Sequence, residues 1–236
     1  MRVTFLAHSG FLVETEQWLL LFDWWQGTLP PLPDKPLAVF VSHRHEDHFS
    51  PRIFSLNDPS RDVTFILSRD IKLSAFNRSR WNLSAETAAR CRSLGGGETL
   101  SLPGLDVETL RSTDEGVAFV AVCGGKTLYH AGDLNWWHWS GEENAWNRNM
   151  ECNFKRYVET LRGRHIDLAM VPLDPRQQDA EDWGLLYLLG LAQVERVLPM
   201  HQWEDYSPTA RLIARRPELA GTVLEVSENG QVFTIE

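Results

Sequence analysis

Residues 37–51, LAVFVSHRHEDHFSP, constrain the fold of this chain more than any other segment. Their first five residues form an apolar run with β-branched side chains, which is typical of a strand buried on both faces. At the other end, Ser50 and Pro51 fit the N-cap and the first position of a helix. Between them lie three histidines and one aspartate: His43, His45, Asp47 and His48. We therefore expect a buried strand, a polar loop and a helix start in close succession.

The spacing of these polar side chains favours a metal site. In an extended segment, side chains two residues apart point the same way, so His43 and His45 can converge on one ion. Asp47 and His48 are adjacent, and they can face a second point nearby as the chain turns toward the helix. Imidazole and carboxylate are ligands for Zn²⁺ or another divalent ion such as Mn²⁺ or Fe²⁺, whereas a structural zinc site more often contains cysteine. The alternative interpretation is a solvated polar loop with scattered histidines.

The segment His43-Arg44-His45-Glu46-Asp47-His48 resembles the HxHxDH signature of the metallo-β-lactamase fold. The resemblance extends along nearly the whole chain, because further motifs of that family occur before and after this segment, in the order in which the family has them. These are Asp23 after an apolar strand, the Gly132-Asp133 pair, and His201 after another strand. The resemblance implies an α/β fold of the αββα four-layer sandwich type, with a hydrolase site for one or two metal ions at one edge.

The resemblance also implies roles for individual residues. A first ion would be held by His43, His45 and a shared Asp133, and a second by Asp47, His48, Asp133 and His201. Asp23 would orient the histidine loop without binding metal. The family usually adds a third histidine to the first site, but Ser112 stands at that position here. Asp114 is the candidate replacement ligand, and water is the alternative, so one ion or two remain open.

Four more residues are candidates for the substrate side. Residues 134–149 are rich in tryptophan and follow Asp133 directly, so Trp136 and His138 are candidate contacts, with His138 also a possible proton donor. His138 can instead be a surface residue beside aromatic packing. Arg176 follows a predicted strand and can pair with a substrate carboxylate or phosphate, or else with a neighbouring aspartate. His8 lies in a predicted turn, where it contacts the substrate, a metal ligand or only the backbone.

Length, charge and cysteine content limit the class of protein. At 236 residues we expect one domain, residues 1–236. The formal net charge of −9 argues against a broad nucleic-acid surface. The cysteines at 91, 123 and 152 are far apart and read as free thiols. We find neither a leader segment nor a run of membrane-spanning length, and so we expect a cytoplasmic protein without a membrane partner.

We expect a metal-dependent hydrolase. In this hypothesis a metal-bound hydroxide attacks an ester, lactone, amide or phosphoester, and Asp47 both binds metal and accepts the proton. The substrate would be a small anionic molecule such as a sugar-phosphate lactone, with Arg176 and His8 as its candidate contacts, and the chain loosely resembles the ascorbate-phosphate lactonases. Two alternatives stay open. One is a nuclease, and the other is a protein of this fold that has lost catalysis and acts in binding or regulation, as the missing histidine suggests.

The remaining pattern predicts strands and helices along the chain. Residues 84–94 have helical character and end at a run of three glycines, so we expect a helix there. Residues 223–226 and 232–235 flank Asn229-Gly230, so we expect them to pair as a closing hairpin.

Overall fold

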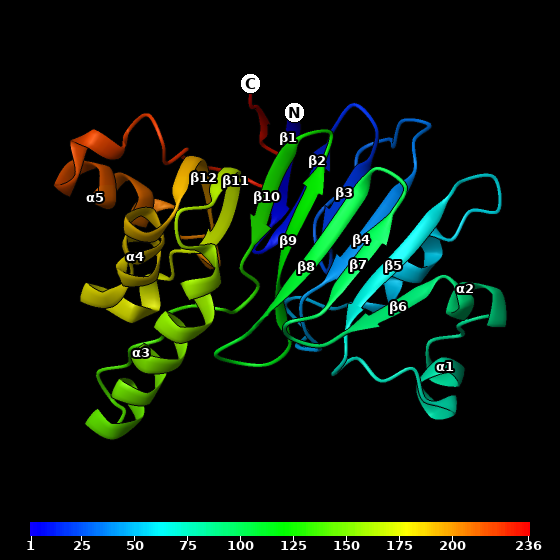
Figure 1. Cartoon of the computed structure of the whole chain (residues 1–236), viewed down its shortest axis with the longest axis horizontal. Helices are drawn as coiled ribbons and strands as arrows, with labels where there is room; N and C mark the ends of the chain where they lie inside the picture. The colour runs from blue at the N-terminus through cyan, green and yellow to red at the C-terminus, as the bar shows by residue number, and fades with distance from the viewer.

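Two β-sheets face each other at the centre of the computed structural model, which describes residues 1–236 (Figure 1). The first sheet has seven strands in the order β13-β1-β2-β3-β4-β5-β6, and the second has six in the order β12-β11-β10-β9-β8-β7. The strands of the first sheet are β1 (Arg2–Ala7), β2 (Gly10–Glu14), β3 (Leu19–Phe22), β4 (Leu37–Val41), β5 (Val63–Ser68), β6 (Cys91–Leu94) and β13 (Val232–Thr234). Those of the second are β7 (Thr99–Leu102), β8 (Leu105–Arg111), β9 (Val117–Cys123), β10 (Lys126–His130), β11 (His165–Pro172) and β12 (Gln193–Met200).

Helices cover the outer sides of this pair of sheets. In Figure 1, α3, α4 and α5 lie beside β11 and β12, whereas α1 and α2 lie beside β5 and β6. The α-helices are α1 (Ala75–Arg80), α2 (Ala85–Ala89), α3 (Asn144–Val158), α4 (Trp183–Leu191) and α5 (Ser207–Arg215). Short 3₁₀ turns are η1 (Pro51–Leu56), η2 (Glu159–Leu161), η3 (Pro175–Ala180) and η4 (Pro217–Leu219). This arrangement is the predicted αββα sandwich.

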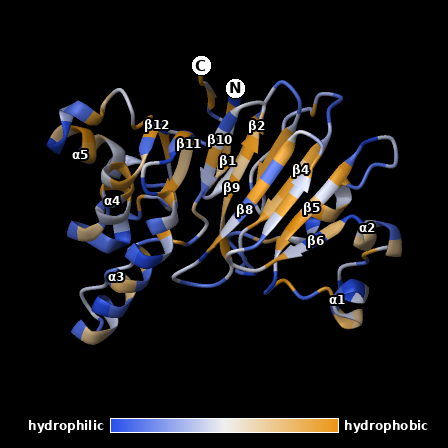
Figure 2. Cartoon of the chain, viewed as in Figure 1, coloured by the Kyte–Doolittle hydropathy of each residue, from blue (hydrophilic) through white to orange (hydrophobic).

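Strand β4 shows how the sequence builds the layers. Ala38 and Phe40 point into the core between the sheets, while Val39 points into a second apolar cluster on the outer side of the first sheet. Ile53 and Phe54 of η1 complete that outer cluster. The strand is therefore buried on both faces, as its unbroken apolar run predicted. Figure 2 shows the same concentration of apolar residues on the strands.

Parallel pairing brings the polar segments to one edge. β3, β4 and β5 run parallel in the first sheet, and β10, β11 and β12 run parallel in the second. Because parallel strands end at the same edge, the segments that follow β3, β4, β10, β11 and β12 meet there.

The helix predicted over residues 84–94 is confirmed only in its first part, and the predicted closing hairpin was wrong. The helix expected over residues 84–94 ends at Ala89, and residues 91–94 form β6, which pairs parallel with β5. The expected closing hairpin does not form, because β13 pairs with β1, while Val223 makes a separate bridge to Val197. In each case an open sheet edge provides backbone partners that local sequence preference does not reveal.

Two further observations concern the chain as a whole. Cys91, Cys123 and Cys152 are all unpaired. None of the helices combines the length and the apolar character needed to cross a bilayer.

Candidate active site

The loop after β4 carries four of the predicted donors, and close packing fixes its backbone. Gly116 adopts φ +73°, and a Cβ atom there would lie 2.0 Å from the carbonyl oxygen of Ser42. Gly132 adopts φ +51°, and its Cβ would lie 2.7 Å from the Cβ of Ser42. Only glycine permits both the positive φ and this approach. The second sheet therefore contacts the start of the histidine loop directly.

A first cluster of donors contains His43, His45, Asp114 and Asp133. One ligand atom of each lies within 4.8 Å of the others. His43 Nε2 is 3.0 Å from His45 Nδ1 and 3.5 Å from Asp133 Oδ2, and His45 Nδ1 is 3.6 Å from Asp114 Oδ2. Asp114, the candidate replacement for the third histidine, thus lies among the donors of this cluster.

Ser112, which stands at that histidine position, lies outside the cluster. Its side-chain oxygen accepts a hydrogen bond of 3.1 Å from the backbone N–H of Asp114. This bond shapes the turn that presents the Asp114 carboxylate to His45.

A second cluster contains His8, Asp47, His48 and His201, again with donor atoms within 4.8 Å of one another. Asp133 is a member of the first cluster, but its carboxylate also contacts the second cluster. Its Oδ1 lies 3.1 Å from His48 Nε2 and 3.4 Å from His201 Nε2, while its Oδ2 faces His43. Asp133 therefore presents one oxygen to each cluster.

These residues fit a divalent cation. Four of their atoms are buried and make no hydrogen bond, although such atoms normally do. They are His8 Nε2, His48 Nε2, His201 Nε2 and Asp133 Oδ1. All four converge on the second cluster, where a bound cation would satisfy them together.

Two buried carboxylates orient the histidines of the second cluster. His48 Nδ1 donates to Asp23 Oδ2 over 2.7 Å, and His201 Nδ1 donates to Asp174 Oδ2 over 2.9 Å. Each bond places the proton on Nδ1 and leaves the lone pair of Nε2 free to face the cluster. Asp23 also accepts a bond from the Ser42 hydroxyl, which ties it to the histidine loop.

The charges of the two clusters also favour a bound cation. Burial favours a higher pKa for Asp133, but the neighbouring His48 and His201 outweigh it and hold the pKa well below the usual range. Burial and the negative charge of Asp133 raise the pKa of Asp114. Asp133 and Asp114 thus face the same space as like charges, an arrangement that a cation between them would stabilise.

His8 reaches the second cluster from the turn between β1 and β2. Its backbone adopts φ +54°, and its carbonyl oxygen accepts a hydrogen bond of 3.2 Å from the N–H of His201. Buried His130 anchors the same turn, because its Nε2 donates to the Ser9 carbonyl oxygen over 2.9 Å. The structure therefore places His8 among the donor atoms of the second cluster.

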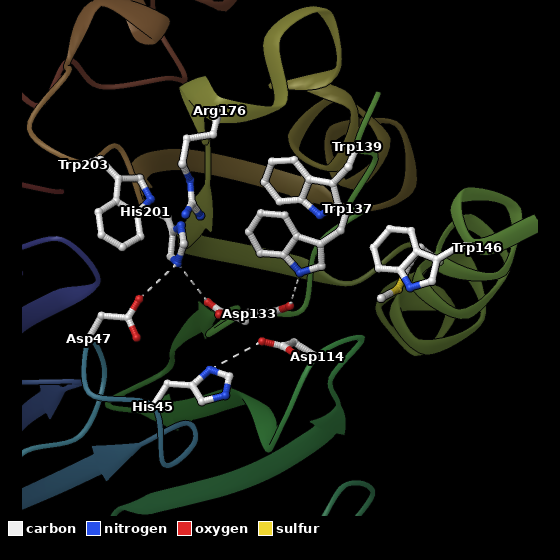
Figure 3. Close-up of a pocket in the computed structure, with 11 residues that line it drawn as sticks. His45, Asp47, Asp114, Asp133, Trp137, Trp139, Trp146, Arg176, His201 and Trp203 are labelled. Atoms are coloured by element: carbon white, nitrogen blue, oxygen red, sulfur yellow. Dashed lines mark hydrogen bonds and ion pairs between the residues drawn. The ribbon is translucent and has the colours of Figure 1, made fainter. Parts of the chain in front are cut away.

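A cavity of about 300 Å³ opens over both clusters (Figure 3). Arg176 and Trp203 lie on one side of it, and a group of tryptophans lies on the other. Arg176 also forms the ion pair considered for it, through Nε and Nη2 to Asp174. The lining residues are His45, Asp47, Asp114, Asp133, Trp137, Trp139, Trp146, Met150, Arg176, His201 and Trp203.

Trp136 and His138 do not line this cavity, in contrast to our expectation. Trp136 packs against Trp183, with ring centroids 5.3 Å apart, and His138 packs against the same ring at 4.8 Å. Trp137 points inward instead, because its Nε1 donates to the Asp133 carbonyl oxygen over 3.0 Å. The tryptophan-rich segment lines the cavity as predicted, but through alternate residues.

The role of Asp174 in orienting His201 was not predicted, because an aspartate near Arg176 was considered only as its ion-pair partner. Asp174 ends the apolar segment VPLD after β11, just as Asp23 ends LLFD after β3. An aspartate at the end of a buried apolar segment was therefore a usable signal at both positions.

Known proteins resemble this chain in sequence and in fold. A family model described as "Beta-lactamase superfamily domain" matches residues 2–143. Over 251 aligned positions that span both chains completely, 30% of residues are identical to a UPF0173 metal-dependent hydrolase from Carboxydothermus hydrogenoformans. A protein of the same name from Desulforamulus reducens is 27% identical over 150 positions, which cover 56% of this chain and 62% of that relative. The metallo-β-lactamase fold protein YhfI from Bacillus subtilis superimposes with a TM-score of 0.61 at 14% identity, covering 99% of each chain.

Proposed function

Because the chain belongs to the metallo-β-lactamase superfamily and is a metal-dependent hydrolase, we propose that it uses two divalent cations to hydrolyse a small anionic ester, lactone or phosphoester. We propose Zn²⁺ as the cation, with Mn²⁺ or Fe²⁺ as its substitutes. The observation that carries this proposal is the pair of donor clusters that share Asp133 at the floor of one cavity.

In the proposed site, His43, His45, Asp114 and Asp133 would hold a first ion, and His8, Asp47, His48 and His201 would hold a second, with the other oxygen of Asp133 facing the second set. A divalent cation in such a site lowers the pKa of water and polarises a substrate oxygen. Both sheets supply donors to each cluster, so we propose that residues 1–236 act as one domain.

The chain's own groups do the remaining work. Asp47 lines the cavity, with Oδ2 3.5 Å from His8 Nε2, and we propose that its carboxylate accepts the proton of the attacking water. Asp23 and Asp174 keep Nδ1 of His48 and His201 protonated and so hold both rings in orientation. Arg176 Nη1 is not used in the ion pair with Asp174, and it remains available for one oxygen of an anionic substrate.

The direct test is metal content and hydrolysis on the same protein. We expect elemental analysis of protein purified without chelator and loaded with Zn²⁺ to give two ions per chain. We also expect hydrolysis of at least one ester, lactone or phosphoester, lost on chelation and restored by the ion. No bound ion under metal-replete conditions would reject the proposal in favour of a non-catalytic protein.

Asp114 decides whether the first cluster is complete. Asp114→Ala is expected to reduce the metal content from two ions to one, with Asp106→Ala on the exposed face of β8 as the matched control. Two ions retained by Asp114→Ala would show that water fills that position instead.

Asp174 is expected to act on the second ion alone. Asp174→Asn keeps the size of the side chain but removes its charge, so His201 loses the partner that fixes its tautomer. We expect affinity for the second ion to fall by roughly 10–100-fold, measured by competition with a coloured chelator. Asp179→Asn, at an exposed position of η3, is the matched control and should bind both ions like the parent protein. Unchanged affinity in Asp174→Asn would contradict the assigned role.

A further inference from the structure

One side of the cavity is an apolar surface of tryptophan and methionine side chains that lies beside the two donor clusters. Trp137 and Trp139 follow Asp133 closely in the chain, and Trp146 and Met150 come from successive turns of α3. All four line the same cavity. An apolar lining of this kind at the mouth of a polar site usually contacts a ligand.

Hydrogen bonds hold this surface in place. Trp137 Nε1 donates to the Asp133 carbonyl oxygen over 3.0 Å, which links the ring to the residue between the clusters. The backbone of Trp139 makes two bonds of 2.9 Å with the side chain of buried Asn147, which links it to α3. The Trp137 ring is therefore oriented before any ligand arrives, and the Trp139 ring stacks on it from a fixed backbone, so binding to these two rings costs little side-chain entropy.

The geometry of the rings favours a flat ligand. The rings of Trp137 and Trp139 lie within 8° of parallel, with centroids 5.7 Å apart. Aromatic rings prefer such offset stacking, and a further planar ring can extend it. Arg176 lies next to them, with its guanidinium carbon 5.6 Å from the centroid of the Trp139 ring and 4.4 Å from the centroid of the Trp203 ring. A cavity of about 300 Å³ is at the small end for ligand sites, so it suits one ring and a short chain.

We propose that the substrate of this hydrolase carries a planar aromatic ring, which stacks against Trp137, Trp139 and Trp146, and an anionic group that binds Arg176. The bond to be hydrolysed then lies between these two anchors, over Asp133. This inference rests on the proposed function, and it narrows the substrate from a small anion to an aryl-bearing one.

The test compares three carboxylates that differ only in the group they carry: 3-phenylpropionate, 3-cyclohexylpropionate and propionate. Dissociation constants are measured by calorimetry on the metal-loaded protein. We expect 3-phenylpropionate to bind roughly tenfold more tightly than the cyclohexyl compound, because only the flat ring can stack. Equal binding of the phenyl and cyclohexyl compounds would overturn the inference.

Variants test whether the preference for 3-phenylpropionate arises at the tryptophans of the cavity. Trp146→Ala should remove most of the preference for 3-phenylpropionate while leaving propionate binding unchanged, and Trp146→Phe should restore the preference. Phe76→Ala, at an exposed aromatic residue of α1 outside the cavity, is the control and should bind all three probes like the parent protein. A uniform loss for all three probes in Trp146→Ala would indicate a structural role and reject the aromatic site.

The binding test for the aromatic ring and the hydrolysis test for the proposed function can fail independently. Hydrolysis without a phenyl preference rejects only the aromatic ring. A phenyl preference that depends on Trp146, in a protein that hydrolyses nothing, keeps the ring and rejects the reaction.

Discussion

Asp133→Asn is expected to release both metal ions and to lower kcat/KM by at least about a thousandfold. Asp133 is the residue with one oxygen toward each cluster, 3.5 Å from His43 Nε2 and 3.1 Å from His48 Nε2. The amide keeps the size of the side chain but offers a single neutral oxygen, so one cluster loses its donor from this residue and the other keeps only a weaker, uncharged one. Elemental analysis and steady-state kinetics on the same preparation measure both effects.

Two further variants sharpen this result. Asp106→Asn, on the exposed face of β8, should retain both ions and full activity. His43→Ala should weaken only the first cluster and leave the second ion bound. If His43→Ala and Asp133→Asn lost metal to the same extent, Asp133 would not be the shared ligand.

Gly116→Ala is expected to cause the largest loss of stability. The added methyl would lie 2.0 Å from the Ser42 carbonyl oxygen and 2.5 Å from His43 Cβ, at a backbone φ of +73°. Overpacking and the left-handed backbone together should cost roughly 4 kcal/mol in the free energy of unfolding. For a chain of this size, that lowers Tm by about 8–16 °C. Thermal unfolding in excess chelator measures this loss without a contribution from bound metal.

Gly124→Ala separates the two causes. Gly124 adopts a positive φ of +57° in the turn between β9 and β10, but no atom lies within 4 Å of the position that an added Cβ would take. Only the backbone cost of about 1 kcal/mol remains there, equivalent to about 2–4 °C in Tm. Similar shifts for Gly116→Ala and Gly124→Ala would show that the contact with the histidine loop has no special cost.

The histidine loop was predictable because its donors are contiguous. Spacing along an extended segment fixes the relative direction of His43 and His45, and this relation needs no information from the rest of the chain. The buried strand before the loop was equally local, since an unbroken apolar run of five residues fits few other structures.

The parts of the site that were harder to predict depend on contacts between distant segments. His8 joins the second cluster because β1 pairs with β2 and its turn meets the end of β12. Asp114 joins the first cluster because the turn between β8 and β9 of the second sheet faces the loop after β4 of the first, which brings its carboxylate to His45. Tertiary pairing, which the local sequence does not encode, determines both positions.

The tryptophan-rich segment shows a different limit. Its composition correctly indicated the cavity wall, but residues 134–143 form no helix or strand whose period could be read. A single bond, from Trp137 Nε1 to the Asp133 carbonyl oxygen, decides which rings face inward. Trp136 and His138 consequently face α4.

Because both sheets supply donors to each cluster, bound metal is expected to stabilise the folded chain. Any ligand that binds only the folded chain stabilises it, by roughly 2.7 kcal/mol when the free ion is at a hundred times its dissociation constant. His8 and His48 lie on the first sheet's side and Asp133 and His201 on the second's, so an ion that joins them resists separation of the halves. Scarcity of the metal would therefore expose the chain to proteases and reduce its amount as well as its activity.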